Sequence, residues 1–243
     1  MLISRHRRLS STGYIVVTID HPYDADIVTL PNNVTILAAN ITTDTQITDD
    51  LNVRVKDVSF VLDQLRSPSV ISRIIPGQTS GLDTSKVGIY GHSLGGATAA
   101  EAMLSDSRLM GGINLDGTFF GSVIERGLKK PFMIMAHEGK NLTSDATWGA
   151  IWPKLRGFRR EFMLGNSTHG TFTDLAEAAD LIGLRERSPT EVAALLGGID
   201  GERALQIITA YTSGFFDFVL KGKKSDLLDK SSKEFPEVTV GGF

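Results

Sequence analysis

The sequence predicts an α/β fold in which a mostly parallel sheet is covered by helices on both faces. Short apolar runs alternate along the chain with stretches of helical spacing, which is the order that successive β-α units produce. The apolar runs, such as residues 14–19 and 131–136, contain few polar residues, as expected for strands buried on both faces. A serine between glycines joins one run to an alanine-rich segment, which predicts a strand, a tight turn and a helix.

The N-terminal part of the chain is expected to hold few regular elements. Residues 1–12 are polar and basic and are predicted to be a loose end. Apolar residues at helical spacing follow a stretch rich in Thr, Asn and Asp. The expected elements are a strand over residues 14–19, a loop over 24–48 with a short hairpin near 34–38, a helix over 48–66 ended by Ser67-Pro68, and a loop over 69–86.

The turn near the centre of the chain has the pattern of a nucleophile elbow. Apolar residues 87–90 lead into Gly-His-Ser-Leu-Gly centred on Ser93, and small helix-forming residues follow at once. Such a turn is strained, so Gly91 and Gly95 are expected to let the strand and the helix cross closely. The pattern predicts the α/β-hydrolase fold, with Ser93 as the nucleophile.

Further strands and helices alternate after this turn. Residues 188–191 read as a capping box with proline at the first helical position. The expected elements are strands over 111–115, 131–136 and 160–164, the last strand of the sheet, and helices over 146–155, from 173, over 189–196 and around 205–219. The polar tail, residues 223–243, is predicted to be a second loose end. The whole chain, residues 1–243, is interpreted as a single domain.

Composition excludes several kinds of site. The 243 residues are 41% apolar and 22% charged, with a net charge of −3, and no basic cluster suggests a nucleic-acid partner. There is no cysteine, which excludes disulfides, thiol catalysis and cysteine-ligated zinc. The sequence contains no apolar run of about 18 residues, so no transmembrane segment is expected.

Two features of the sequence bear on whether the protein is secreted or cytoplasmic. No secretory signal is recognisable at the start of the chain. Four of the seven asparagines nevertheless lie in Asn-x-Ser/Thr sequons, at Asn33, Asn40, Asn141 and Asn166. These sequons favour a secreted, glycosylated parent, and a cytoplasmic protein is the alternative.

Catalysis by a serine requires a base, and the sequence favours His169 for that role. A hydroxyl is a poor nucleophile until a histidine takes its proton and a carboxylate orients that histidine. Of the five histidines, His169 follows the last predicted strand, where this fold places its base. The side chain of His92, inside the elbow, is expected to face away from Ser93. The backbone N–H of Leu94, directly after the nucleophile, is the predicted oxyanion donor.

The acid has three candidates. The common position in this fold points to Glu138 or Asp145, after the predicted strand that ends at residue 136. The other position follows the strand directly after the elbow helix and gives Asp116, which a glycine follows. The residues alone place Asp116 only modestly ahead of the other two.

Two motifs resemble the platelet-activating factor acetylhydrolase family. They are Gly-His-Ser-Leu-Gly-Gly-Ala-Thr around Ser93 and Gly-Ile-Asn-Leu-Asp-Gly around Asp116, and the two residues are 23 positions apart, as in that family. Residues 12–21 resemble the family's preceding strand, and residues 167–174 resemble its histidine loop. The resemblance spans about residues 10–220 and implies that Asp116 is the acid.

The resemblance implies a serine esterase that releases short acyl groups from phospholipid-like esters. It implies no metal or cofactor, and a lipid or small-molecule ester as the partner, with contact to a lipid surface possible. A general carboxylesterase, polyester hydrolase or lactone hydrolase is the alternative within the same chemistry.

The chain departs from the family near its start. Only 13 residues precede Tyr14, so the family's Gly-Leu-Gly loop, which supplies a second oxyanion donor, is absent. The strand between the 14–19 strand and the elbow strand is also expected to be missing. These departures indicate a shortened relative and raise a further alternative, a catalytically impaired chain that acts as a binding protein.

Overall fold

The computed structural model describes residues 3–241. Its centre is one five-stranded sheet with the strand order β3-β4-β5-β6-β7. The first four strands are parallel, and β7 pairs antiparallel with β6. The strands are β3 (Val87–His92), β4 (Leu109–Leu115), β5 (Phe132–His137), β6 (Arg159–Leu164) and β7 (Val238–Gly241). The predicted α/β fold with a mostly parallel sheet is therefore confirmed.

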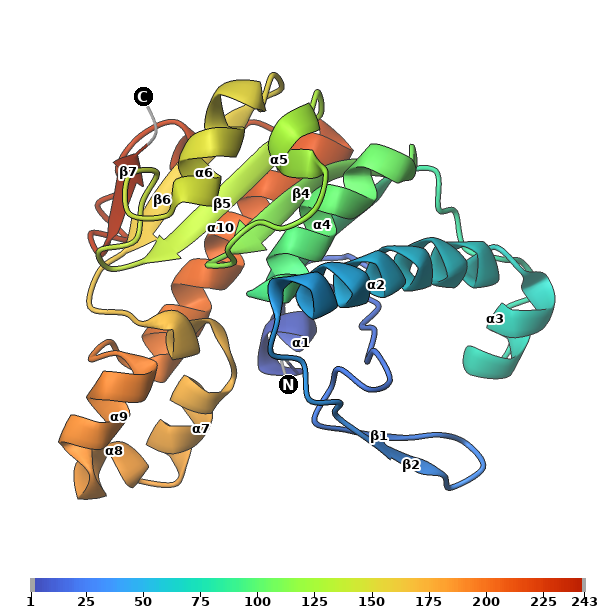
Figure 1. The fold of residues 1–243 in the computed structure, drawn as a ribbon, viewed down its shortest axis with the longest axis horizontal. Coiled ribbons are helices and arrows are strands. Elements are labelled where there is room, and N and C mark those ends of the chain that lie inside the picture. Colours follow the sequence, from blue (N-terminus) through green and yellow to red (C-terminus); the bar gives the residue numbers. More distant parts are fainter. Residues whose placement is uncertain (1–2, 242–243) are drawn as a thin grey trace.

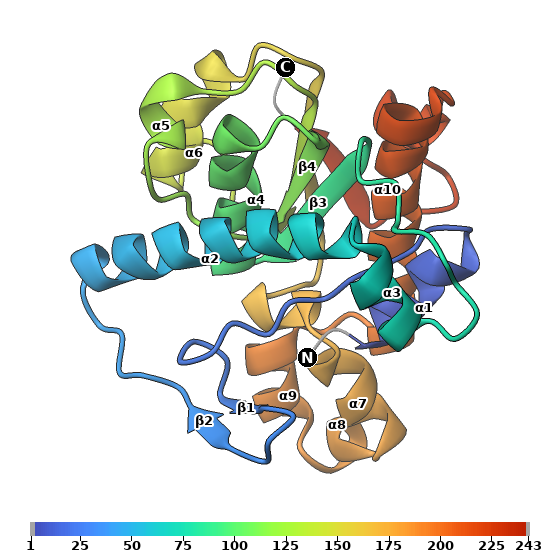
Figure 2. The ribbon, with the colours of Figure 1, turned by 90° about the vertical axis from the view of Figure 1, so that its right-hand side faces the viewer.

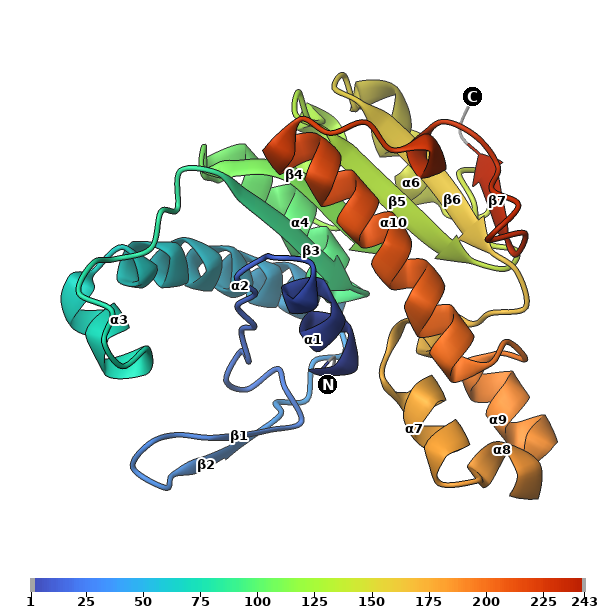
Figure 3. The same ribbon diagram turned by 180° about the vertical axis from the view of Figure 1, so that it is seen from behind.

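Helices cover both faces of this sheet, as the side view in Figure 2 shows. Those over one face are α2 (Asp44–Leu65), α4 (Leu94–Ser105), α5 (Val123–Arg126) and α6 (Ala146–Ile151), the last continued by the 3-10 turn η1 (Trp152–Lys154) (Figure 1). The long helix α10 (Gly201–Lys221) crosses the other face, with α1 (Ile3–Ser11) beside it (Figure 3). No helix among residues 3–241 is both long and apolar enough to cross a membrane.

The core consists of two apolar clusters, one on each face of the sheet. Ile113 and Leu115 of β4 pack with Tyr211 and Phe215 of α10 on one side. The other side holds the alanines of α4 together with aromatic and aliphatic side chains of β5 and α6. Because both faces of β4 and β5 are covered, these strands carry apolar or small residues at almost every position.

Two segments lie outside the sandwich of sheet and helices. The short helices that lie between β6 and α10 in the sequence form a lobe beyond the edge of the sheet (Figure 1). The hairpin β1–β2 extends away from the main sheet. These elements are η2 (His169–Phe172), α7 (Leu175–Leu181), α8 (Leu184–Arg187), α9 (Pro189–Leu196), β1 (Ile27–Thr29) and β2 (Thr35–Leu37). The hairpin overlaps the one expected near residues 34–38.

Residues 14–19 do not form the predicted strand. The segment alternates: Tyr14 and Val16 pack against the α10 core, whereas Ile15 and Val17 are 70% and 46% exposed. A strand needs a hydrogen-bonding neighbour, and within residues 3–241 the only strand paired with β3 is β4. The Tyr14 hydroxyl instead donates to the Asp217 carboxylate of α10 over 2.5 Å. Ile19 packs against the other core cluster, so the apolar run reflects partial burial of alternate side chains rather than membership of a sheet.

The described parts of both predicted loose ends contain regular elements, and residues 1–2 and 242–243 lie outside the described residues. Within residues 1–12, α1 buries Leu9, and Arg8 forms an ion pair with Glu202 of α10. The tail contains the 3-10 turn η3 (Asp226–Leu228) and β7, and it buries Phe235 against Tyr211. The segment 160–164 is therefore not the last strand. Few apolar residues suffice to hold each end, which is why average polarity misled the prediction.

Helix boundaries differ where local polar contacts decide them. Helix α2 begins at Asp44, four residues before the predicted start, because Thr43 forms a capping box with Gln46. Residues expected to be a loop contain α3 (Pro68–Ile74), which has proline at its first position and buries Ile71. The predicted helix over 189–196 is present as α9, but the side chain of its N-cap, Ser188, makes no capping hydrogen bond.

Candidate active site

The turn after β3 has the backbone strain that a nucleophile elbow requires. Ser93 lies between β3 and α4 with φ 56° and ψ −126°, a conformation that costs a non-glycine residue about 1–3 kcal/mol. Its N–H donates to the Leu115 carbonyl at the end of β4 over 3.0 Å. This bond ties the elbow to the neighbouring strand and holds Ser93 at the carboxyl edge of the sheet.

Close backbone contacts explain the small residues around Ser93. A Cβ atom on Gly91 would lie 2.2 Å from the carbonyl carbon of Gly95, and one on Gly117 would lie 2.0 Å from the Ser93 carbonyl oxygen. A Cβ atom on Gly95 would meet nothing within 4 Å. The crossing of β3 and α4 therefore requires Gly91 to be small, and the turn after β4 requires the same of Gly117. The expectation for Gly95 is not met.

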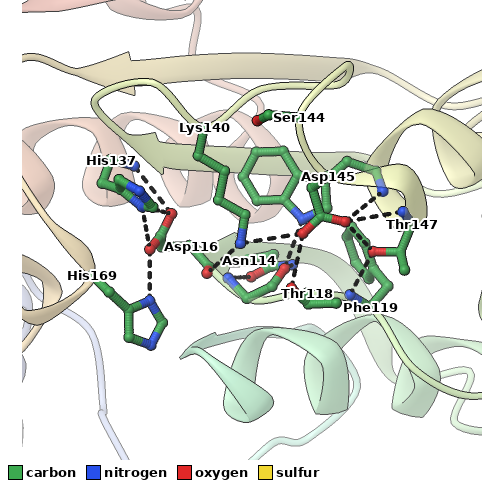
Figure 4. Close-up of polar contacts among 12 residues, drawn as sticks. Asn114, Asp116, Thr118, Phe119, His137, Lys140, Ser144, Asp145, Thr147 and His169 are labelled. Carbon is green, nitrogen blue, oxygen red and sulfur yellow. Dashed lines mark hydrogen bonds and ion pairs between the residues drawn. The ribbon is translucent and has the colours of Figure 1, made fainter.

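The predicted acid and base lie within hydrogen-bond distance of each other. His169, the first residue of η2, places its Nδ1 2.6 Å from Oδ2 of Asp116, which follows β4 (Figure 4). The His169 ring also packs against the ring of His92, with centroids 4.3 Å apart. His92 precedes Ser93, so the base candidate lies beside the elbow. The roles of Ser93, Asp116 and His169 in catalysis stay predictions.

Asp116 is a buried carboxylate in a fixed turn. Its side chain is fully buried, and its φ is 61°. The side-chain amide of Asn114 bonds to both backbone groups of Gly117, the residue after Asp116. Its Nδ2 donates to the Gly117 carbonyl and its Oδ1 accepts from the Gly117 N–H, both over 2.7 Å. Trp148 Nε1 donates to the same carbonyl over 2.7 Å. These bonds define the turn that presents Asp116 to His169.

The surroundings keep Asp116 ionised. Burial on its own would raise the pKa of this carboxyl group. Hydrogen bonds from His169 and His137 and the nearby charge of Lys140 outweigh burial, so the pKa of Asp116 lies below its ordinary value. A negative charge at this point can stabilise the imidazolium that forms when a histidine takes a proton.

The two other acid candidates make different contacts. Glu138 Oε2 accepts from the backbone N–H of Asn166 over 2.8 Å. Asp145 is the N-cap of α6, where its Oδ1 accepts from the Thr147 N–H over 2.9 Å, and its Oδ2 accepts from Thr118 Oγ1 over 2.8 Å. The structure brings Asp116 to His169, and the described contacts of Glu138 and Asp145 are with other groups.

One histidine near this pair was not singled out from the sequence. His137, the last residue of β5, places its Nδ1 2.8 Å from Oδ1 and 2.7 Å from Oδ2 of Asp116 (Figure 4). The ring of His92, which was expected to face away from Ser93, packs on the ring of His169. The available signal for His137 was its position at the carboxyl end of β5, next to β4, because the ends of parallel strands share one edge of a sheet.

Leu94 is the first residue of α4. The first N–H groups of a helix have no acceptor within the helix and carry a partial positive charge. An anion that forms at Ser93 would therefore lie beside a helix N-terminus, which favours negative charge. The oxyanion role of Leu94 stays a prediction.

A polar cavity opens beside His137. It has a volume of about 600 Å³ and is lined by Thr118, His137, Gly139, Lys140, Ser144, Asp145, Ala146 and Thr147. Lys140 Nζ donates to the Asp116 carbonyl over 2.9 Å, lies 3.3 Å from Asp145 Oδ2 and sits over the Trp148 ring. These contacts link the loop after β4 to the loop after β5 (Figure 4).

The four sequon asparagines, Asn33, Asn40, Asn141 and Asn166, are all exposed. Exposure is necessary for glycosylation and does not show it, so modification of these residues stays a prediction.

The candidate site lies inside the part of the chain that a family model matches. The model described as platelet-activating factor acetylhydrolase, isoform II, covers residues 77–226, which is more than half of the chain and includes Ser93, Asp116 and His169. The chain belongs to this family. The resemblance inferred from the two sequence motifs is confirmed.

Relatives of the chain carry the names of esterases. It is 32% identical to a probable 1-alkyl-2-acetylglycerophosphocholine esterase of Arthroderma benhamiae, over 95% of this chain and 59% of the relative. It is 29% identical to a platelet-activating factor acetylhydrolase of Cavia porcellus, over 55% of this chain and 30% of that protein.

A solved structure supports the same fold. A ferulic acid esterase from Streptomyces cinnamoneus superposes with a TM-score of 0.77 at 33% identity, over 91% of this chain and 63% of that one. The chain therefore spans less than two thirds of the length of each relative named here.

Proposed function

We propose that the chain is a serine esterase that works through Ser93, His169 and Asp116. The observation that carries the proposal is the 2.6 Å contact between His169 Nδ1 and the buried Asp116 carboxylate, beside a strained serine turn. Membership of the acetylhydrolase family supports the same chemistry.

In this proposal His169 Nε2 takes the proton of the Ser93 hydroxyl as its oxygen attacks the ester carbonyl. The Leu94 N–H stabilises the oxyanion, and the α4 N-terminus adds its partial charge. The tetrahedral intermediate collapses, His169 returns the proton to the leaving alcohol, and an acyl-enzyme remains. Water deprotonated by the same histidine then releases the acid. Asp116 holds the imidazole through Nδ1 and stabilises its cationic form.

We further propose a short acyl ester of a phospholipid-like alcohol as the substrate. The Arthroderma relative, named as an alkylacetylglycerophosphocholine esterase, supports this choice. The structural likeness to a ferulic acid esterase supports a second candidate, a general carboxylic ester with an aromatic acid. Hydrolysis rates of an acetylated ether phospholipid, methyl ferulate and p-nitrophenyl acetate would rank these substrates directly.

Labelling with a fluorophosphonate probe tests the nucleophile. The wild-type chain should be labelled at Ser93, as located by mass spectrometry of the peptide. Ser93→Ala should remove the label and lower kcat by roughly 10⁴- to 10⁶-fold, because the whole triad depends on the attacking oxygen. A folded wild-type chain that stays unlabelled would contradict the esterase proposal and favour the binding-protein alternative.

A further inference from the structure

Two imidazoles share the Asp116 carboxylate, and the proposed mechanism uses only one of them. His169 approaches Oδ2 from η2 at 2.6 Å. His137 approaches from the end of β5, with its Nδ1 2.8 Å from Oδ1 and 2.7 Å from Oδ2. In a triad the acid needs one histidine partner, so the second imidazole calls for an explanation.

The two carboxylate oxygens have different partners. Oδ2 accepts from both imidazoles, whereas the contacts described for Oδ1 both come from His137, through its ring Nδ1 at 2.8 Å and its backbone N–H at 3.1 Å. The Asp116 side chain is fully buried, and that of His137 is 31% exposed. The His137 ring therefore spans both carboxylate oxygens, its backbone N–H adds a second contact to Oδ1, and the second contact of Oδ2 comes from His169.

We propose that His137 is a positioning residue that fixes the plane of the Asp116 carboxylate for His169. This inference rests on the esterase function proposed above. Hydrogen bonds to Oδ1 stop the carboxylate from rotating about its Cβ–Cγ bond, so Oδ2 stays in line with His169 Nδ1. They also stabilise the ionised form of a buried acid, which is costly to leave without partners.

The proposal assigns the proton on His137. Its Nδ1 must carry a hydrogen to donate to the carboxylate, so in the neutral ring Nε2 is the acceptor. His137 also lines the cavity of about 600 Å³, so replacing its ring changes a cavity wall rather than the packed core. Substitutions at this position can therefore test the hydrogen bond without a large packing defect.

Asparagine and leucine are a matched pair for this test. In asparagine, Nδ2 is as many bonds from Cα as Nδ1 is in histidine, so His137→Asn can keep a donor toward Oδ1. His137→Leu has the same branching as asparagine but no donor. A hydrogen bond to a charged group contributes about 1.5–3 kcal/mol, which corresponds to roughly a 10- to 100-fold change in rate.

The experiment measures kcat and KM for p-nitrophenyl acetate in the wild type and both variants, with circular dichroism melts as a fold control. His137→Leu should lower kcat by roughly 10- to 100-fold with KM little changed, and His137→Asn should restore kcat to within about threefold of the wild type. Fluorophosphonate labelling of Ser93 should slow in the leucine variant in the same proportion.

Three outcomes would overturn the inference: equal kcat losses in the two variants, a leucine variant as active as the wild type, or a loss confined to KM. If the leucine variant does not fold, His137→Ala takes its place as the variant without a donor and is read by the same criteria. An inactive, unlabelled wild type would instead defeat the esterase proposal itself, so the two failures can be told apart.

Discussion

The carboxyl edge of the sheet and the N-terminal segment before α2 are held in place by different means. At the edge, backbone atoms approach so closely that a methyl group on Gly91 or Gly117 would overlap them, and the Asn114 amide bonds both sides of the following turn. Each position there is fixed by several independent contacts.

The N-terminal segment packs Leu9, Tyr14 and Val16 against the core, and polar side chains attach it to α2. His21 Nδ1 lies 2.7 Å from Asp57 of α2, and Arg54 of α2 forms ion pairs with Asp24 and Asp50. Burial lowers the pKa of Arg54 to about 10, against the nearby charge of Asp57. Several large apolar side chains of this segment are exposed to solvent, among them Ile15, Val17, Ile27 and Leu37.

The carboxyl edge carries the candidate catalytic residues, whereas the N-terminal segment only packs beside the sheet and α2. A catalytic geometry must hold within about 0.5 Å, and contacts that admit no alternative packing achieve that. A segment held by a few core contacts and ion pairs can vary in sequence with little effect on the carboxyl edge. The predictions below test this contrast, beginning with the largest expected effect.

Replacement of the buried acid should cause the largest loss in activity. Asp116→Asn keeps the shape but removes the charge that orients His169, and it should lower kcat by about 10⁴-fold. The matched control is Glu138→Gln, at a carboxylate whose described contact is with the Asn166 N–H, and it should change kcat by less than about threefold. Hydrolysis of p-nitrophenyl acetate measures both. The reverse ranking would refute Asp116 as the acid.

The sequence located this acid only with the help of a resemblance. Ser93 follows from a local motif, because the elbow must be built from neighbouring small residues. The pairing of Asp116 with His169 joins residues 53 positions apart, and strand order decides it. The glycine after Asp116 separates it only modestly from Asp145, since both follow a predicted strand and either could face the edge. His137 was missed because its contact is with Asp116, which follows the neighbouring strand β4.

A single methyl group should damage the elbow at one glycine and not at the other. In Gly91→Ala the added Cβ would lie 2.2 Å from the Gly95 backbone, which cannot move without shifting α4. Overpacking of this kind costs about 1–3 kcal/mol. In Gly95→Ala the Cβ meets nothing within 4 Å, and alanine is the better helix former. Urea unfolding should show a lower free energy of unfolding for Gly91→Ala only. Equal losses would contradict the close crossing inferred at Gly91.

The sequence predicted the strands that are covered on both faces, and it did not predict segments in which only some of the side chains are buried. Strands β4 and β5 are covered on both faces, so their apolar runs identified them. Residues 14–19 have a similar composition, but Tyr14, Val16 and Ile19 reach the core whereas Ile15 and Val17 are exposed, and a run of apolar letters does not reveal which side chains face a partner. The start of α2 depends on one side-chain exchange between Thr43 and Gln46, a contact that periodicity does not register.

The N-terminal segment should give the smallest effect. Ile15 and Val17 are 70% and 46% exposed, so Ile15→Ser and Val17→Ser should each change the free energy of unfolding by no more than about 0.5 kcal/mol. Ile113 is fully buried in β4, and Ile113→Ala should cost about 2–5 kcal/mol. Urea unfolding of the three variants measures the contrast. If the two serine variants lost as much stability as Ile113→Ala, the residue 14–19 segment would be packed like a strand of the sheet, and the contrast with the carboxyl edge would fail.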